Sequence, residues 1–78
     1  MMAWYIVLIE TEDKLVVAYS VENNDTCDGR LVFDKHTYEM NIVQECSNEG
    51  NHGMYGPIRG RLMNHRYQVG KKMFVAIG

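Results

Sequence analysis

The sequence predicts a single small α+β domain with the element order ββββαβ: a mainly antiparallel five-stranded sheet with one helix packed on one face. Three observations carry this prediction. The first 44 residues hold four runs rich in β-branched and aromatic residues, a Gly-Pro pair then opens a segment with helical spacing, and a last apolar run follows Gly70. A chain of 78 residues makes one domain, spanning residues 1–78, and its hydrophobic fraction of 46% suits a globular core.

The first two predicted strands form a hairpin that is apolar on both faces. Trp4–Glu10 and Leu15–Glu22 flank the polar turn Thr11–Lys14. Folding the chain about this turn gives three apolar pairs on one face, namely Leu8 with Val17, Ile6 with Tyr19 and Trp4 with Val21. The opposite face is also apolar, with Tyr5, Val7, Ile9, Val16 and Ala18. Strands of this kind are typical of the covered centre of a sheet.

The second predicted hairpin alternates cleanly. Gly29–Phe33 and Thr37–Gln44 are joined by the turn Asp34–Thr37. The apolar residues share one face in three pairs, namely Phe33 with Tyr38, Leu31 with Met40 and Gly29 with Ile42. The other face carries Arg30, Glu39 and Asn41. This alternation predicts a half-exposed hairpin near the sheet edge.

The last third is expected to add a loop, a helix and a strand. Ser47–Gly56 is polar and glycine-rich, which is typical of a loop, and Pro57 suits the first turn of a helix. Ile58 and Leu62, with His65 or Arg66, are expected to form the stripe that faces the core, although Gly60 weakens the helix. Gly70 and Lys71 end it, and Lys72–Ile77 is predicted as the last strand, beside either the first strand or the fourth.

One helix can cover only one face of a five-stranded sheet, so the doubly apolar first hairpin needs a second cover. A twofold partner would supply that cover, whereas strong sheet twist is the alternative that would hide the same residues within one chain. We therefore expect a homodimer or another protein partner.

Composition excludes several classes of protein. No stretch approaches the roughly 20 apolar residues of a membrane span. The opening MMAWYIVLIE lacks the basic region and small-residue cleavage site of a signal peptide. The two cysteines are too few for a secreted disulfide scaffold. We expect a cytoplasmic protein without membrane attachment.

The charges are strongly segregated along the chain. All ten carboxylates precede residue 50, where three cations accompany them to give a net charge of −7, while the five formal charges from Gly50 onward are all positive. Such segregation indicates either that the two parts hold each other or that the basic part meets an anionic partner.

The basic part contains a candidate site for an anion or a partner. Its members are Tyr55, Arg59, Arg61, His65, Arg66 and Lys71. Guanidinium groups near a helix N-terminus can hold phosphate, and tyrosine rings can stack on bases. However, the spacing matches no phosphate-binding loop, and the sequence pI of about 5.8 is far below that of most nucleic-acid modules. We favour the interpretation in which these cations lie across the acidic sheet or in solvent.

Cysteine and histidine suggest weaker alternatives. Extending the register of the second hairpin places Cys27 and Cys46 near each other on one face, but no zinc-type spacing occurs, so we expect two buried thiols and neither metal nor cofactor. No spacing selects a catalytic set. The sequence thus favours a small interaction or regulatory module without catalytic activity that self-associates. The alternative is a binder of nucleic acid or another polyanion, and a minor third is an enzyme or metal protein built around Cys46, His52 and His65.

Overall fold

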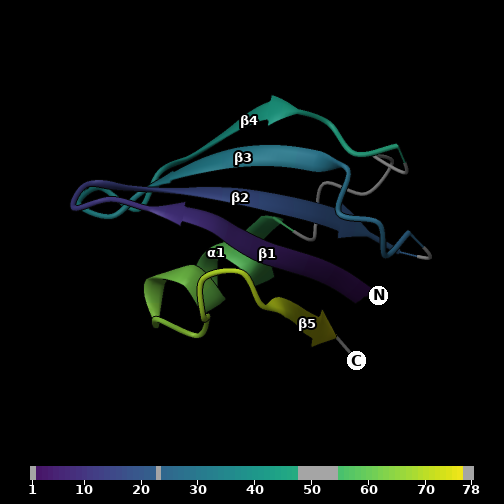
Figure 1. The fold of residues 1–78 in the computed structure, drawn as a ribbon. Helices are drawn as coiled ribbons and strands as arrows, with labels where there is room; N and C mark the ends of the chain where they lie inside the picture. Colours follow the sequence, from purple (N-terminus) through teal and green to yellow (C-terminus); the bar gives the residue numbers. More distant parts are fainter. Residues whose placement is uncertain (1, 23, 48–54, 77–78) are drawn as a thin grey trace.

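The computed structural model describes residues 2–22, 24–47 and 55–76. Within them the chain forms β1 (Met2–Glu10), β2 (Lys14–Val21), β3 (Gly29–Asp34), β4 (Met40–Gln44), α1 (Tyr55–Met63) and β5 (Lys72–Ala76). The strands make one antiparallel sheet in the order β4-β3-β2-β1-β5, and α1 lies against one of its faces (Figure 1). The predicted ββββαβ fold is confirmed. The last strand pairs with β1, which decides between the two positions that the sequence left open.

A β-bulge in β1 makes the predicted register of the first hairpin wrong by one residue. Across most of the hairpin the pairs on the helix face are Ala3 with Val21, Tyr5 with Tyr19 and Val7 with Val17. The predicted partners of these three β2 residues were instead Trp4, Ile6 and Leu8. The register shifts between Val7 and Ile9, where β1 has one extra residue. Because side chains alternate between faces, Tyr5 and Val7 lie toward the helix and Ile6 lies on the opposite face.

The second hairpin keeps its predicted faces but pairs two residues further along. Phe33 pairs with Met40 and Leu31 pairs with Ile42, so the predicted partners are wrong. The turn is longer because the Asp34 carboxylate accepts hydrogen bonds from two backbone N–H groups, those of His36 (2.8 Å) and Thr37 (3.0 Å). The shift of two residues leaves Phe33, Leu31, Met40 and Ile42 on one face and Asn41 on the other, as predicted. A second bulge, at Val43 in β4, then places Gln44 opposite Arg30. As expected, this hairpin forms one edge of the sheet.

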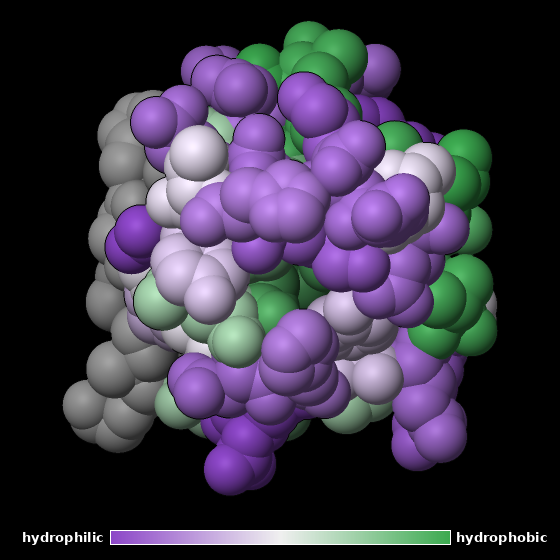
Figure 2. Space-filling view, turned by 90° about the vertical axis from the view of Figure 1, so that its left-hand side faces the viewer, coloured by the Kyte–Doolittle hydropathy of each residue, from purple (hydrophilic) through white to green (hydrophobic). Residues whose placement is uncertain are grey.

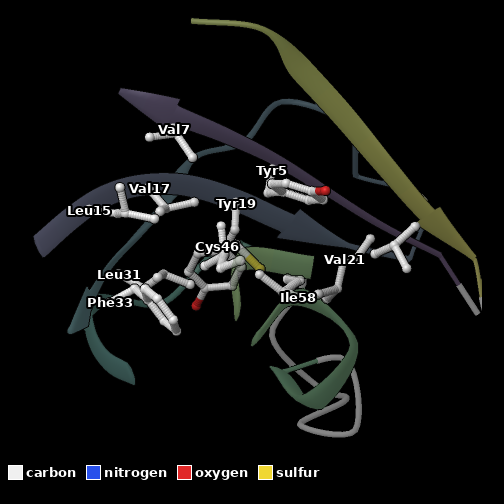
Figure 3. Close-up of a cluster of buried hydrophobic side chains, with 13 residues drawn as sticks. Tyr5, Val7, Leu15, Val17, Tyr19, Val21, Leu31, Phe33, Cys46 and Ile58 are labelled. Atoms are coloured by element: carbon white, nitrogen blue, oxygen red, sulfur yellow. The ribbon is translucent and has the colours of Figure 1, made fainter. Parts of the chain in front are cut away.

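The core lies between the sheet and α1 (Figure 3). Its buried residues are Ala3, Tyr5, Val7, Leu15, Val17, Tyr19, Val21, Leu31, Phe33, Cys46, Ile58, Leu62 and Val75. Gly29 is needed at its position because a Cβ there would lie 2.5 Å from Cε1 of Tyr19. The Tyr19 ring therefore packs directly on the backbone of β3.

The short helix presents two residues to this core. Ile58 and Leu62 are both buried, as the predicted stripe requires, but its extension to His65 or Arg66 is wrong because both are exposed beyond the helix end. His65 has a φ of 56° and occupies the left-handed position that usually belongs to glycine after a helix. The backbone N–H groups of residues 65 and 66 donate to the carbonyls of residues 62 and 61, which completes a Schellman cap. Most of the predicted loop Ser47–Gly56, His52 included, lies outside the described residues.

Candidate functional site

The residues predicted as an anion or partner site lie in one stretch of the chain, from α1 to the residue before β5. Tyr55, Arg59, Arg61, His65, Arg66 and Lys71 are spread along α1, its C-terminal turn and the approach to β5. A phosphate site needs several donors directed at one point. The ranges that the structure describes contain no pocket, and in those ranges Arg59, Arg61, Arg66 and Lys71 form no ion pair.

Arg59 attaches α1 to the sheet. Its Nε donates a hydrogen bond of 2.6 Å to the carbonyl oxygen of Tyr38, which lies in the turn between β3 and β4. Tyr38 has a φ of 65°, and its ring stacks against Phe33 with 6.1 Å between ring centroids. The expected alternatives for Arg59 were a carboxylate of the acidic sheet or solvent. The structure shows instead that a backbone carbonyl accepts the hydrogen bond from Arg59.

Arg61 and Arg66 lie close to the hydroxyl of Tyr5. Tyr5 comes from the centre of β1 and is fully buried, and its hydroxyl donates a 2.6 Å hydrogen bond to the carbonyl oxygen of Arg66. Burial raises the pKa of Tyr5, while the positive charges of Arg61 and Arg66 act in the opposite direction. This contact ties the segment after α1 to the middle of the sheet.

His65 lies beside a polar cluster that the sequence did not predict. Its ring centroid is 6.3 Å from that of Tyr67, whose hydroxyl donates a 2.7 Å hydrogen bond to Oε2 of Glu10. The same carboxylate oxygen accepts a hydrogen bond of 3.0 Å from Nζ of Lys35, which also donates to the carbonyl oxygen of Thr11 at 2.8 Å. The hydrogen bonds from Tyr67 and Lys35 lower the pKa of Glu10. Burial, together with the Glu10 carboxylate, raises the pKa of Tyr67 to about 12.

The bulge in β1 creates this cluster. Beyond it Glu10 pairs with the buried Leu15 and lies on the helix side of the sheet, where Tyr67 and Lys35 reach it. Without the extra residue, strict alternation would place Ile9 on that side instead. No pattern in the sequence marks the bulge.

The two cysteines lie on opposite sides of the sheet, so the predicted common face is wrong. Cys46 belongs to the core beneath α1 (Figure 3), and a Cβ on Gly29 would lie 3.0 Å from its Cβ. Cys27 packs against Ser20 on the other side: its backbone N–H donates to the Ser20 hydroxyl at 3.1 Å, and the Ser20 hydroxyl lies 3.8 Å from its sulfur. Both are buried, as expected, and burial raises the pKa of the Cys27 thiol. The described residues contain no cluster of three or more metal-ligating side chains.

The face of the sheet opposite α1, called here the open face, carries an apolar surface (Figure 1). Cys27 of the β2–β3 connection covers its end at Ser20, and no helix or strand of the described residues covers the rest. The strand registers place apolar side chains on this face from four strands, namely Met2, Trp4, Ile6, Ile9, Val16, Ala18, Val32, Phe74 and Ala76. Trp4 and Phe74 pack together with ring centroids 4.8 Å apart, yet 42% of Phe74 remains exposed. Ile9 and Val43, at or next to the two bulges, are 54% and 69% exposed.

Figure 2 looks along the strands from the end that carries the two hairpin turns. Hydrophilic residues cover most of that end, whereas hydrophobic residues show at the top of the view and along its right-hand margin. That margin corresponds to the side of the molecule that faces the reader in Figure 1, which is the face of the sheet opposite α1. The sequence predicted that the first hairpin needs a cover on its second apolar face, and that face belongs to the uncovered surface.

Charged residues stand at both edges of the sheet and also on its inner strands, which carry Glu10, Lys14, Arg30 and Asp34. Acidic Glu39 and Glu45 flank β4 at one edge, whereas Lys71 and Lys72 stand at the start of β5 at the other, and all four are exposed. Nζ of Lys72 lies 5.3 Å from the ring centroid of Trp4 and 3.8 Å from a carboxylate oxygen of Asp25. The segregation of charge in the sequence is therefore only partly carried over to the two edges, because Asp25 of the acidic part lies beside Lys72 at the β5 edge.

Comparisons with known proteins give no assignment: no family model matches the chain, and neither the curated proteins nor the solved structures contain a significant match. Among the described residues, no helix has the length and apolar character needed to cross a membrane.

Proposed function

We propose that this chain is a small interaction or regulatory module that binds another protein through the open face of its sheet. The observation that carries this proposal is the difference between the two faces: α1 covers one, while the other has half-exposed Trp4, Ile6, Val16 and Val32 and an exposed Phe74 around a buried Ala18. Exposed apolar surface of this extent is typical of protein–protein contact sites. The indole of Trp4 and the ring of Phe74 are also of the kind that carries binding energy at interfaces.

Two features make the open face suitable for binding. Its backbone is a sheet held by regular pairing on β1, β2 and β3, so it is rigid before any partner arrives. Its centre contains Ile6, Val16 and Val32, while charged residues flank its edges. An apolar centre with a polar rim is the usual anatomy of a protein interface.

Site-resolved photocrosslinking tests this proposal. A benzophenone side chain replaces Val32 or Phe74 on the open face or, as a control, the exposed Asn64 after α1, and native host cells are irradiated. We expect protein adducts from positions 32 and 74 and far weaker ones from position 64. Adducts that are equally strong at all three positions, or confined to position 64, would contradict the proposal.

A second candidate function is polyanion binding by the basic third. The observation that favours it is that Arg66 and Lys71 are exposed and form no ion pair within the described ranges. A labelled single-stranded oligonucleotide of about 20 bases, titrated at about 20 mM and about 150 mM salt, tests it. Affinity is expected to fall with salt and on Arg66→Ala with Lys71→Ala, but not with the control Lys14→Ala. Absence of binding at low salt removes this candidate.

A further inference from the structure

We infer that the partner on the open face is a second copy of this chain, packed face to face about a twofold axis parallel to the strands. The inference rests on the proposed function, because it uses the same surface, and it specifies the occupant and its orientation. A twofold contact requires a surface that is complementary to itself. The open face meets that requirement in shape and in charge.

The side chains at the centre of the open face are small and uncharged. The middle strand of the five is β2, and its outward residues Val16 and Ala18 lie between Ile6 of β1 and Val32 of β3. Ala18 keeps the central ridge low, which allows two sheets to approach to the usual separation of about 10 Å. The one cation near the centre is Arg30, whose guanidinium donates to two backbone carbonyls at 2.7 Å and 2.8 Å and is held at that end of β3.

The edges of the face carry opposite charges at matching heights. The strand registers connect one row across the whole sheet, through Lys72, Ile6, Ala18, Arg30 and Gln44. Lys72 at the β5 edge is therefore level with Gln44 at the β4 edge, and the exposed Glu45 follows directly. The distance across five strands is about 20 Å, so Lys72 and Glu45 cannot meet within one chain, where the carboxylate beside Lys72 is that of Asp25 at 3.8 Å.

A twofold axis parallel to the strands brings these charges together. This axis places β5 of one protomer over β4 of the other and leaves each residue at the same position along the strand direction. Lys72 of each protomer then faces Glu45 of its partner, which gives two such pairs in the dimer. An axis perpendicular to the strands would instead stack like edges, placing acids on acids and lysines on lysines. Like charges in contact are unfavourable, so charge selects the first arrangement.

The size of the face sets the expected strength. Five strands at a spacing of about 4.8 Å, and about five residues along each, give a flat area of roughly 400 Å² per protomer. Interfaces at this lower end of the size range are typically weak. We therefore expect a dimer in the micromolar range that salt weakens further, because its orientation depends on exposed ion pairs.

Sedimentation equilibrium on the purified chain, from about 5 µM to about 300 µM, tests the inference. The mass is expected to rise from the 9.0 kDa of one chain toward twice that value. Val32→Lys, on the open face, is expected to abolish the rise, while the control Val69→Lys, a 54% exposed position in the connection before β5, leaves it intact. Far-ultraviolet circular dichroism confirms that both variants are folded.

Charge reversal tests the orientation with changes confined to exposed residues. Glu45→Lys and Lys72→Glu are each expected to weaken dimerisation about fivefold or more, and the double variant is expected to restore it. A constant mass of one chain, an unrestored double variant, or open-ended assembly beyond a dimer would each overturn the inference. Crosslinks from positions 32 and 74 to a different protein, with a monomeric chain in solution, would refute the dimer alone and leave the proposed function standing.

Discussion

At the scale of single residues, Tyr5 shows how one hydroxyl can organise a small core. Its ring lies between β2 and β5 on the helix side, and its hydroxyl reaches the chain just after the helix cap, 61 residues away. The carbonyl of Arg66 that accepts this hydrogen bond belongs to a turn already held by the left-handed His65. A single polar contact thus fixes where the connection to β5 begins.

Tyr5→Phe is expected to destabilise the fold by about 1 to 2 kcal/mol, because it removes one buried hydrogen bond and leaves a carbonyl without its donor. Urea unfolding followed by circular dichroism measures the change. Tyr38→Phe is the matched control, since that ring is 41% exposed and its hydroxyl makes no hydrogen bond with any residue that the structure describes. Equal stability of the two variants would contradict the role assigned to Tyr5.

The Glu10–Tyr67 hydrogen bond predicts a defined pH window. The folded pKa of Glu10 is lowered, so its contribution to stability is present above the ordinary value of 4.5 and is lost as pH falls through the folded pKa. The pKa of Tyr67 is raised to about 12, so its contribution is present below the ordinary 10.0 and is lost as pH rises between those two values.

Ultraviolet titration of tyrosinate measures the alkaline side of this window. We expect late titration from Tyr67 and from the buried Tyr5, and the Tyr67 component should disappear in Tyr67→Phe. In Glu10→Gln the pKa of Tyr67 should fall but stay above 10.0, because burial remains as the larger cause of the shift. Glu12→Gln removes a neighbouring exposed carboxylate and is expected to leave the titration unchanged. An unaltered Tyr67 midpoint in Glu10→Gln would contradict the assignment.

At the scale of elements, the sequence predicted the six elements and the central place of β1 and β2, but not the contacts at their ends. Alternation and turn residues depend on neighbours along the chain, so they are visible in a single sequence. A bulge depends on which residues of β1 face the core after it packs on α1, and the run Tyr5–Ile9 is apolar at every position. Such a run fits either register, which is why the faces of Ile6 and Val7 were exchanged in the prediction.

The same reasoning explains what was missed in the candidate site. The basic cluster was visible as composition, whereas its contacts use backbone carbonyls: Arg59 donates to the carbonyl of Tyr38, and the carbonyl of Arg66 accepts from the Tyr5 hydroxyl. Backbone acceptors carry no sequence signal. The open face, by contrast, follows from counting apolar residues against a single helix, and the sequence did predict it.

Two glycines in different elements are expected to respond in opposite ways to alanine. Gly29→Ala should destabilise by about 1 to 3 kcal/mol, because the new Cβ would lie 2.5 Å from the Tyr19 ring and the ring cannot move without displacing the core. Gly60→Ala should stabilise by up to about 1 kcal/mol, because Gly60 is inside α1 and a Cβ there meets nothing within 4 Å. Thermal and urea unfolding measure both, and destabilisation by both variants would contradict this packing.

At the scale of the whole molecule, part of the segregation of charge along the chain becomes a polarity across the sheet. The acidic segment ends in β4 and the basic segment ends in β5, and the topology places these two strands at opposite edges. Lys72 pairs with Asp25 within the chain, but the two edges keep unlike charges, with Glu39 and Glu45 beside β4 and Lys71 and Lys72 at the start of β5. These unlike charges lie on either side of an apolar face, so a second copy packed on this face would bring each charged edge against the opposite charge.

Dimerisation through that face predicts a melting temperature that rises with protein concentration, because the partner binds the folded chain alone. Each tenfold increase above the dissociation constant adds about 0.7 kcal/mol per chain, since two chains share the gain, which corresponds to roughly 3 to 5 °C for a domain of this size. Scanning calorimetry at two concentrations tenfold apart measures the shift. Val32→Lys should melt at one temperature regardless of concentration, whereas Val69→Lys should keep the shift. A wild-type melting temperature that is independent of concentration up to about 300 µM would show that the open face is not closed by a second copy.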